Sequence, residues 1–214
     1  MNDSVDLDRR ERRAEKRRTE LVAIARDLFL GSPYSQVSVE AIAAAAELSK
    51  VTVYSYFESK LDIYCAILVA DAQVLVDAFR EAYDPARDLR SNMKRLSRAY
   101  ATFLEGHPEY FQRFSWYYLP GREERLPGHF GALIGEKFSE AQSIVEQCLA
   151  HAAEQGEIPR RDFKALAVAI YAQWLGLAYL RIANSPESGR SAIDHKRIAD
   201  QALDLTVRGL IARD

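Results

Sequence analysis

The chain has 214 residues, of which 48% are hydrophobic and 28% are charged, and its formal net charge at pH 7 is −2. This balance is typical of a water-soluble globular protein with enough apolar side chains for one large core or two smaller ones. No apolar run approaches the roughly 20 residues of a membrane span, and the charged N-terminus lacks the hydrophobic segment of a signal peptide. We therefore expect a cytoplasmic protein.

The first segment of the chain mixes cations with acids. The cations are Arg9, Arg10, Arg12, Arg13, Lys16, Arg17 and Arg18, and the interleaved acids are Asp3, Asp6, Asp8, Glu11, Glu15 and Glu20. Such a mixture is typical of a solvated helix start or a frayed arm that carries salt bridges. It also fits an arm that contacts nucleic-acid phosphates or a minor groove, with a shallow dependence on salt. Both interpretations stay open.

A helix is predicted over residues 19–30, where the apolar positions recur with helical spacing and Gly31-Ser32-Pro33 marks the end. Two short helices joined by a tight turn follow. Ser38 is a suitable N-cap for the first of these and Ser49 for the second, which we expect to end near Phe57.

The next four residues, Ser59-Lys60-Leu61-Asp62, form the pattern of a capping box, so a longer helix is predicted to begin there. Its N-terminus would present Lys60 and the positive end of the helix dipole to a phosphate group.

The second short helix has an unusual solvent face. Val53 and Phe57 lie four residues apart and can enter a small core. The remaining positions carry a cation, hydroxyls, a branched apolar residue and two phenols, namely Lys50, Val51, Thr52, Tyr54, Ser55 and Tyr56. Such side chains suit a DNA major groove, where hydroxyls reach phosphates and base edges and methyl groups touch thymine.

These motifs resemble the N-terminal DNA-binding domain of the tetracycline-repressor (TetR) family of bacterial transcriptional regulators. The resemblance covers residues 17–68. Its family positions are occupied here by Leu28-Phe29, Tyr34, Ser38-Val39, Ile42-Ala43, Ser49-Lys50, Thr52-Val53-Tyr54, Tyr56-Phe57 and Ser59-Lys60. The resemblance implies that the second short helix is the recognition helix, with Arg18, Ser38, Ser49 and Lys60 as further contacts to DNA.

Two positions depart from the family pattern. Glu47 stands where the family prefers glycine in the turn, which predicts a residue forced toward positive φ at a cost of roughly 1 kcal/mol. Val51 stands where Gly, Pro or Ala is common, which places a branched apolar group on the predicted DNA face. The second departure makes the operator sequence unpredictable.

The rest of the chain predicts only helices, with about nine in total and no strand-like alternation. The expected ranges are residues 59–83, 85–105, 108–119, 129–155, 162–184 and 191–212, with loops at 121–128 and 185–189. The fold class is therefore all-α. We expect a DNA-binding domain over residues 1–58 and a larger helical bundle over residues 59–214, with the helix that begins at residue 59 bridging the two.

Aromatic residues are concentrated in the larger domain. They fit either an ordinary core or the wall of a ligand cavity, because Tyr and Trp combine apolar bulk with a polar tip. The family resemblance implies an effector pocket in this region. The candidate ligand contacts are Tyr100, Phe103, Tyr110, Phe114, Tyr117 and Trp174, with His107 or Gln173 as polar anchors.

An enzyme, a cofactor and a metal site are not expected. His107-Pro108-Glu109 matches the H-x-E of zinc deaminases, but no C-x-x-C completes that site. No H-x-x-x-H pair, G-x-S-x-G motif or phosphate-binding glycine loop occurs. Cys65 and Cys148 lie in apolar helical patterns, where buried free thiols are the simpler interpretation and a redox switch is the alternative.

The last two predicted helices carry apolar residues on more than one face, which exceeds what contacts within one chain need. Two-fold packing of both helices against a second copy would cover them. The expected interface residues are Ala169, Ala172, Gly176, Leu180, Ala202, Leu205 and Leu210. A fully intramolecular core is the alternative.

The sequence therefore predicts a homodimeric repressor that binds a palindromic operator as double-stranded DNA and is released by a small apolar or aromatic effector. It would act in the bacterial cytoplasm, at the nucleoid when bound. The competing hypothesis is an architectural or partner-binding helix-turn-helix protein without an effector.

Overall fold

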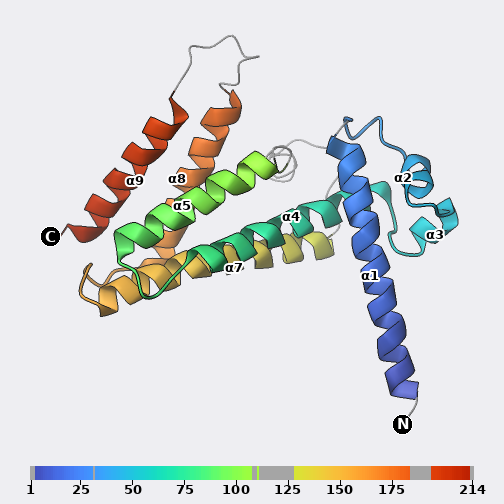
Figure 1. Cartoon of the computed structure of the whole chain (residues 1–214), viewed down its shortest axis with the longest axis horizontal. Helices are drawn as coiled ribbons and strands as arrows, with labels where there is room; N and C mark the ends of the chain where they lie inside the picture. Colours follow the sequence, from blue (N-terminus) through green and yellow to red (C-terminus); the bar gives the residue numbers. More distant parts are fainter. Residues whose placement is uncertain (1–2, 31, 108–109, 111–127, 184–193, 213–214) are drawn as a thin grey trace. The chain divides into compact units, whose positions relative to one another are not determined.

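The computed structural model describes residues 3–30, 32–107, 110, 128–183 and 194–212, and in these ranges it contains eight α-helices and no strand (Figure 1). The helices are α1 (Asp3–Leu30), α2 (Val39–Ala45), α3 (Lys50–Tyr54), α4 (Lys60–Ala82), α5 (Leu89–Gly106), α7 (Gly128–Glu154), α8 (Phe163–Ala183) and α9 (His195–Ile211). The all-α prediction is confirmed. Apart from Tyr110, the predicted helix at 108–119 lies outside the described residues, as do Phe114 and Tyr117, residues 121–127 and the predicted loop at 185–189.

Most helix boundaries follow from local capping. The Ser38 hydroxyl accepts a hydrogen bond from the Ala41 amide at 3.0 Å, and the Ser49 hydroxyl accepts one from the Thr52 amide at 3.1 Å. Both serines are therefore N-caps, as predicted. Four boundaries differ from prediction by three residues or more. Helix α1 begins at Asp3 rather than residue 19, and α3 ends at Tyr54 rather than near Phe57. Helix α5 begins at Leu89 rather than residue 85, and α9 begins at His195 rather than residue 191, each after an aspartate N-cap.

The start of α4 is a variant of the predicted capping box. The Ser59 hydroxyl accepts from the Asp62 amide at 3.1 Å, as the motif requires. The Asp62 carboxylate, however, accepts from the amide of Glu58 at 2.9 Å, one residue before the cap. Asp62 is buried, so this bond also satisfies a carboxylate inside the fold.

The chain divides into two compact units. Unit 1 comprises residues 1–70 and 119–132, and unit 2 comprises residues 71–118 and 133–214. The division falls inside α4, between Ala70 and Asp71, so this helix belongs to both units. The predicted boundary lay between residues 58 and 59, with the same helix as the bridge.

The core of unit 1 is built from the apolar faces of α1, α2 and α3 and the start of α4. Leu21, Phe29, Ile42, Val53 and Ile63 are all buried in it. An aromatic group closes one side of this core, since the rings of Phe29, Tyr34 and Tyr64 lie 5.0–5.9 Å apart. The short helices α2 and α3 are therefore held by tertiary packing, which their lengths require.

The core of unit 2 contains a second aromatic cluster. The Trp174 ring of α8 lies 5.7 Å from Phe79 of α4 and 5.9 Å from Tyr100 of α5. The turn between α4 and α5 is fixed by the buried Asn92 amide, which donates to the carbonyls of Asp84 and Arg87 at 2.9 and 3.0 Å. This cluster holds α5 and α8 side by side, with α9 against both.

Both cysteines are buried free thiols. Burial raises the pKa of Cys65 and of Cys148 to about 12. Because the thiolate is the reactive form, thiols with such pKa values react slowly while the fold is intact. These properties favour packing residues over a redox switch.

Helix α8 lies within the predicted range 162–184 and is more apolar than the sequence analysis allowed. Residues 163–181 have a mean hydropathy of 1.4, so by length and composition alone this helix could cross a membrane. Only 28% of that stretch is buried in the described structure. The expectation that no apolar run approaches a membrane span is therefore wrong for this helix.

The turn between α2 and α3 carries the predicted strain. Glu47 has a φ of 54°, the left-handed region that a Cβ atom disfavours. We expect Glu47→Gly to raise the free energy of unfolding by up to about 1 kcal/mol in urea titrations, because lost strain outweighs the added freedom of the unfolded chain. Glu47→Ala is the matched control, since it removes the same carboxylate but keeps the Cβ. Equal stabilisation by both variants would contradict this account.

Candidate nucleic-acid interface and ligand pocket

Helix α3 turns its apolar side into the core of unit 1 and its polar side outward. Val53 and, just beyond the helix, Phe57 are buried. On the opposite side Val51 is 79% exposed and Tyr54 is 43% exposed, and Lys50 and Ser55 are exposed as well. Thr52 and Tyr56 are only half-buried. The residues predicted to meet DNA therefore form one outer face of a small, firmly packed helix.

The hydroxyls around this face make local hydrogen bonds. The Ser49 and Thr52 hydroxyls lie 2.8 Å apart, and the Ser55 hydroxyl donates to the Thr52 carbonyl at 2.7 Å. The capping bonds of Ser38 and Ser49 use hydroxyl oxygens as acceptors. The Ser38 hydroxyl also hydrogen-bonds the Glu40 carboxylate, and the Ser49 hydroxyl shares a bond with that of Thr52. A bond from Ser38 or Ser55 to DNA would therefore replace a bond within unit 1.

Lys50 is paired within the same unit. Its ammonium hydrogen-bonds the Glu40 carboxylate of α2 and lies 5.8 Å from the centre of the Tyr54 ring. The hydrogen bond raises the pKa of Lys50 and lowers the pKa of Glu40. Both side chains are exposed, so water and salt screen the pair and the ammonium can exchange Glu40 for another anion.

Lys60 was predicted to contact a phosphate, but its ammonium is bonded within the protein. Its ammonium donates to the carbonyls of Tyr34 and Val37 at 2.8 and 3.0 Å and lies 4.1 Å from the centre of the Tyr34 ring. These contacts fasten the segment between α1 and α2 to the start of α4. A lysine has three ammonium hydrogens, so only one remains for a phosphate.

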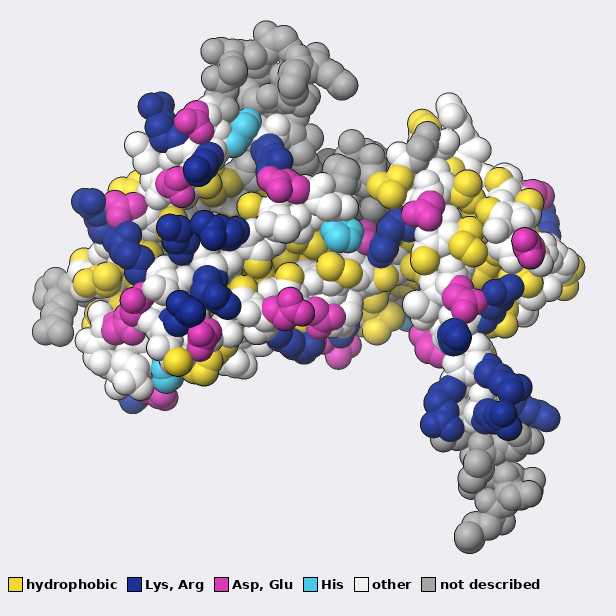
Figure 2. Space-filling view, viewed as in Figure 1, with side chains coloured by type: hydrophobic (Ala, Val, Ile, Leu, Met, Phe, Trp, Pro, Cys, Tyr) yellow, Lys and Arg dark blue, Asp and Glu magenta, His cyan; other side chains and the backbone are white. Residues whose placement is uncertain are grey.

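The basic segment belongs to α1. Arg18 stacks over the Phe57 ring at 4.8 Å, and Arg17 pairs with Glu20 at 2.8 Å. Nearer the N-terminus the Lys and Arg side chains gather around α1 and are exposed (Figure 2). The helical form of this segment excludes a frayed arm over its described residues, and the phosphate contact stays a prediction.

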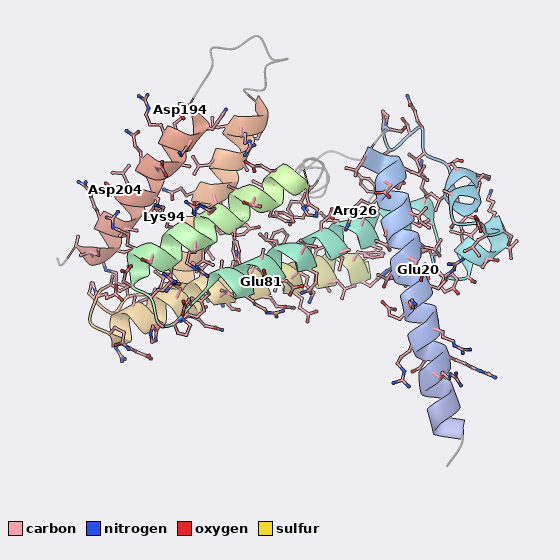
Figure 3. The ribbon with its side chains drawn as sticks, viewed as in Figure 1. Glu20, Arg26, Glu81, Lys94, Asp194 and Asp204 are labelled. Carbon is pink, nitrogen blue, oxygen red and sulfur yellow. The ribbon has the colours of Figure 1, made fainter. Side chains whose placement is uncertain are left out.

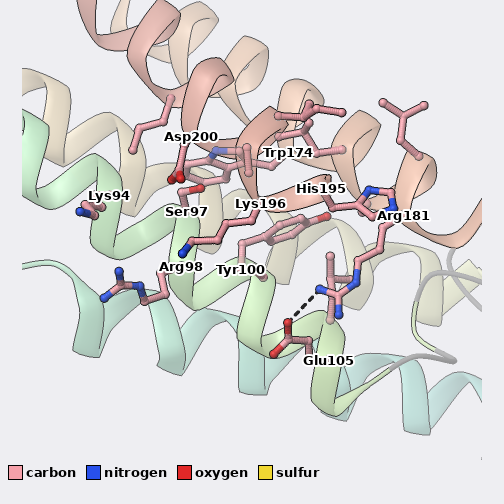
Figure 4. Close-up of a pocket in the computed structure, with 18 residues that line it drawn as sticks. Lys94, Ser97, Arg98, Tyr100, Glu105, Trp174, Arg181, His195, Lys196 and Asp200 are labelled. Atoms are coloured by element: carbon pink, nitrogen blue, oxygen red, sulfur yellow. Dashed lines mark hydrogen bonds and ion pairs between the residues drawn. The ribbon is translucent and has the colours of Figure 1, made fainter. Parts of the chain in front are cut away.

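Unit 2 contains a pocket of about 500 Å³ between α5, α8 and α9 (Figure 4). Two of the predicted ligand residues, Tyr100 and Trp174, line it. The Tyr100 hydroxyl is hydrogen-bonded to Tyr171, and burial raises the pKa of Tyr100 well above its usual value. Tyr100 therefore offers the pocket an apolar ring rather than an ionisable group.

The other predicted ligand residues that the structure describes, Phe103, His107, Tyr110 and Gln173, do not line this pocket. Phe103 stacks on His107 at 4.7 Å and meets Tyr110 edge-on at 4.8 Å. His107 Nε2 lies 4.0 Å from the carboxylate of Asp71, a fully buried residue that the sequence prediction missed. These residues form a separate aromatic cluster.

Gln173 is engaged in the contact between α8 and α9, because its carbonyl oxygen accepts from the Thr206 hydroxyl at 2.8 Å. The same helix pair is tied to α5 by Arg90, which donates to Asp204 of α9 at 3.1 Å (Figure 3, where Asp204 is labelled). Within the described ranges no group of three or more His, Cys, Asp or Glu side chains could hold a metal ion.

The predicted interface residues divide into two groups. Ala169, Ala172, Gly176, Leu180 and Leu205 are exposed, and Ala202 is half-buried. Leu210 is the exception, because only 4% of it is exposed and its side chain already packs inside the single chain. Its assignment to an outer interface is therefore wrong. The sequence prediction also missed three exposed apolar residues, Val168, Tyr179 and Ile211.

A three-helix head with an outward-facing α3, followed by a helical unit with its own pocket, defines the class of helix-turn-helix regulators. Residues 21–67 match the model of the family described as "Bacterial regulatory proteins, tetR family". Over these residues the chain resembles the DNA-binding domain of TetR-family transcriptional regulators.

One curated relative is the HTH-type transcriptional activator FasR of Mycolicibacterium smegmatis, 31% identical over 91 residues. The aligned part is 42% of this chain and 42% of that protein, less than half of either.

Solved structures share the fold over most of the chain. A tetR-family regulatory protein from Rhodococcus RHA1 has a TM-score of 0.66 at 20% identity, covering 93% of this chain and 99% of that one. The regulator FadR from Bacillus subtilis, solved in complex with stearoyl-CoA, has a TM-score of 0.67 at 17% identity, covering 89% and 98%.

Unfolding in urea tests whether Lys60, unlike Lys50, holds the fold together. We expect Lys60→Ala to lower the free energy of unfolding by about 1–3 kcal/mol, because two carbonyls lose their donor. Lys50→Ala, the matched control, should leave the unfolding midpoint in urea unchanged. A Lys60→Ala variant as stable as the wild type would remove Lys60 from the fold-holding contacts.

Proposed function

We propose that this protein is a homodimeric repressor that binds a palindromic DNA operator and is released by a small, largely apolar effector. The observation that carries the proposal is the outer face of α3. On this face Val51 and Tyr54 are exposed beside Lys50 and Ser55. A helix face that only meets water would more usually carry charged side chains than a valine and a tyrosine. Such a face can read base edges and thymine methyl groups in a major groove.

The contacts to DNA divide into two kinds. Lys50, Val51, Thr52, Tyr54, Ser55 and Tyr56 are assigned to the groove. Ser38 and Ser49 offer hydroxyls to phosphates, and Arg18 and the exposed cations of α1 add charge beside them. Lys60 is assigned a weaker phosphate contact, because its ammonium already makes two hydrogen bonds inside the protein.

The uncovered apolar surface of α8 and α9 supports the dimer. Leu205 is 69% exposed and Tyr179 is 60% exposed, and Val168, Leu180 and Ile211 are also exposed. Ala169, Ala172 and Gly176 present small side chains on α8, which allow a second helix to approach closely. A two-fold axis would pair these helices with their copies and place two recognition helices on successive grooves, about 34–36 Å apart.

Effector control is supported by the pocket in unit 2 and by the continuity of α4, which belongs to both units. An effector shifts the equilibrium only if it binds the DNA-free state more tightly than the DNA-bound state. The B. subtilis relative in the fold comparison binds stearoyl-CoA, so a long apolar ligand is compatible with this architecture.

The direction of regulation has a physical basis in our proposal. A bound dimer covers DNA and blocks polymerase without any further contact, whereas activation needs a specific polymerase contact. The curated relative FasR is named an activator, so a reporter assay must read the sign directly. Repression predicts higher reporter expression when the gene is deleted.

The recognition face can be tested after an operator has been selected from random DNA with the wild-type protein. Tyr54→Ala and Lys50→Ala should each weaken operator binding by about tenfold in fluorescence anisotropy, since each removes a groove contact. Arg160→Ala, which removes an exposed cation beyond α7, is the control and should bind like the wild type. Wild-type affinity in both α3 variants would exclude this face as the DNA reader.

The dimer interface can be tested with Leu205→Glu, which places a charge on the most exposed apolar residue of α9. We expect a monomer by light scattering, because a buried unpaired carboxylate opposes association. Val74→Glu on α4 is the matched control, since Val74 is also an exposed apolar residue but lies outside α8 and α9. A Leu205→Glu dimer, or a monomeric wild type, would contradict the proposed interface.

A further inference from the structure

We propose that the pocket between α5, α8 and α9 binds an amphipathic anion, an apolar chain or ring that carries a carboxylate or phosphate group. This inference rests on the proposed function and deepens it by naming the chemical class of the effector. It uses residues that the sequence predicted only in part, because the charged members of the pocket have the composition of ordinary helix surface.

The inner wall of the pocket is apolar. The Tyr100 and Trp174 rings stack with centroids 5.9 Å apart and an interplanar angle of 28°. Leu104 of α5, Leu177 of α8 and Leu203 of α9 complete three sides of this wall. Such a wall gains free energy by covering an apolar ligand, in proportion to the area removed from water.

The opening of the pocket is cationic. Lys94 and Arg98 come from α5, Arg181 from the end of α8 and Lys196 from the start of α9 (Figure 4). Among the described residues two carboxylates, Glu105 and Asp200, line the same pocket. The excess of four cations over two carboxylates is opposite in sign to the formal charge of the whole chain, −2.

One of these charges is already neutralised within the pocket. Arg181 pairs with Glu105 at 2.9 Å, the contact drawn as a dashed line in Figure 4. Lys94, Arg98 and Lys196 make no ion pair with any carboxylate of the described residues. Outside the Arg181–Glu105 pair, three cations from two helices and one carboxylate, Asp200, line this pocket, and an anionic group bound by these cations could bridge α5 and α9.

The start of α9 lies at the pocket, and its first residue, His195, lines the pocket beside Lys196. The partial positive charge of this helix N-terminus is already met by the Asp194 carboxylate, which accepts a hydrogen bond from the Arg197 amide at 2.9 Å. The selection for charge therefore rests on the side-chain cations. A neutral ligand would cover the apolar wall but leave these cations without an anion, and a cationic ligand would be repelled by them. The chemistry of the pocket therefore selects an amphipathic anion.

Binding there would involve the helix that carries the proposed dimer surface. Ile198, Ala199 and Leu203 of α9 line the pocket, while Leu205 of the same helix is exposed. A ligand held by both α5 and α9 would restrict the position of α9, and through it the packing of α8 and α9 against a second copy.

The inference can be tested with four probes that share one chain length. Decanoate and decyl phosphate carry anionic groups, decanol is neutral and decyltrimethylammonium is cationic. With the full-length dimer, below the micelle concentration of each probe, titration calorimetry should show both anions binding about tenfold more tightly than decanol. The cation should not bind measurably. The two anions distinguish a carboxylate ligand from a phosphate ligand.

Matched variants locate the binding. Arg98→Gln combined with Lys196→Gln should remove the advantage of decanoate over decanol. Arg197→Gln removes an exposed cation next to Lys196 that does not line the pocket, and it should bind like the wild type. All these changes are on exposed side chains, so folding is not at risk. A third variant, Ala199→Trp, should block all probes by filling the pocket.

Equal affinity for decanol and decanoate, or an unchanged preference in the double variant, would overturn the inference. Protection of another region by the probe, in hydrogen exchange, would do the same. DNA binding by the probe-free protein is measured in parallel. A protein that binds the anions but no DNA would contradict the proposed function alone, whereas one that binds DNA but no anion would contradict this inference alone.

Discussion

The structure of unit 1 depends on the burial of Val53 and Phe57 in the small core made by α1, α2 and α4. Helix α3 has five residues, too few to be stable alone, so this burial both forms the helix and fixes its rotation. Once the apolar side is fixed, Val51 and Tyr54 must face outward. Lys60, bonded to the carbonyls of Tyr34 and Val37, ties the segment before α2 to α4. The DNA-reading proposal therefore follows from how a core is filled.

In unit 2, too, the packing of the core positions the candidate site. The stacked rings of Tyr100 and Trp174 join α5 to α8 and also form the inner wall of the pocket. Helix α8 is apolar around most of its circumference, and one side is covered by its own unit. The proposed dimer would cover the other side, and α9 would then contribute to both the ligand pocket and the interface.

Much of the fold could be predicted from sequence because local chemistry determines it. The caps Ser38 and Ser49, and the strained Glu47, act over three or four residues, and each was found where the pattern predicts it. The candidate site was less predictable, since it depends on which helices become neighbours. The aromatic pattern led to the prediction of Phe103, His107 and Tyr110 as ligand contacts, but these residues form a separate cluster. Lys94, Arg98 and Lys196 have the composition of an ordinary solvated helix surface, and only the neighbouring positions of α5 and α9 bring them to one pocket. Leu210 was assigned outward because periodicity alone cannot tell the two apolar sides of α9 apart.

The central claim is that two copies of the outer face of α3 read DNA together. Hydroxyl-radical footprinting on a selected DNA fragment tests it most directly, because it reports which sugars the protein covers. The account predicts two symmetric protected segments whose centres lie a whole number of helical turns apart, on one side of the duplex. A single protected segment, or protection without two-fold symmetry, would contradict it.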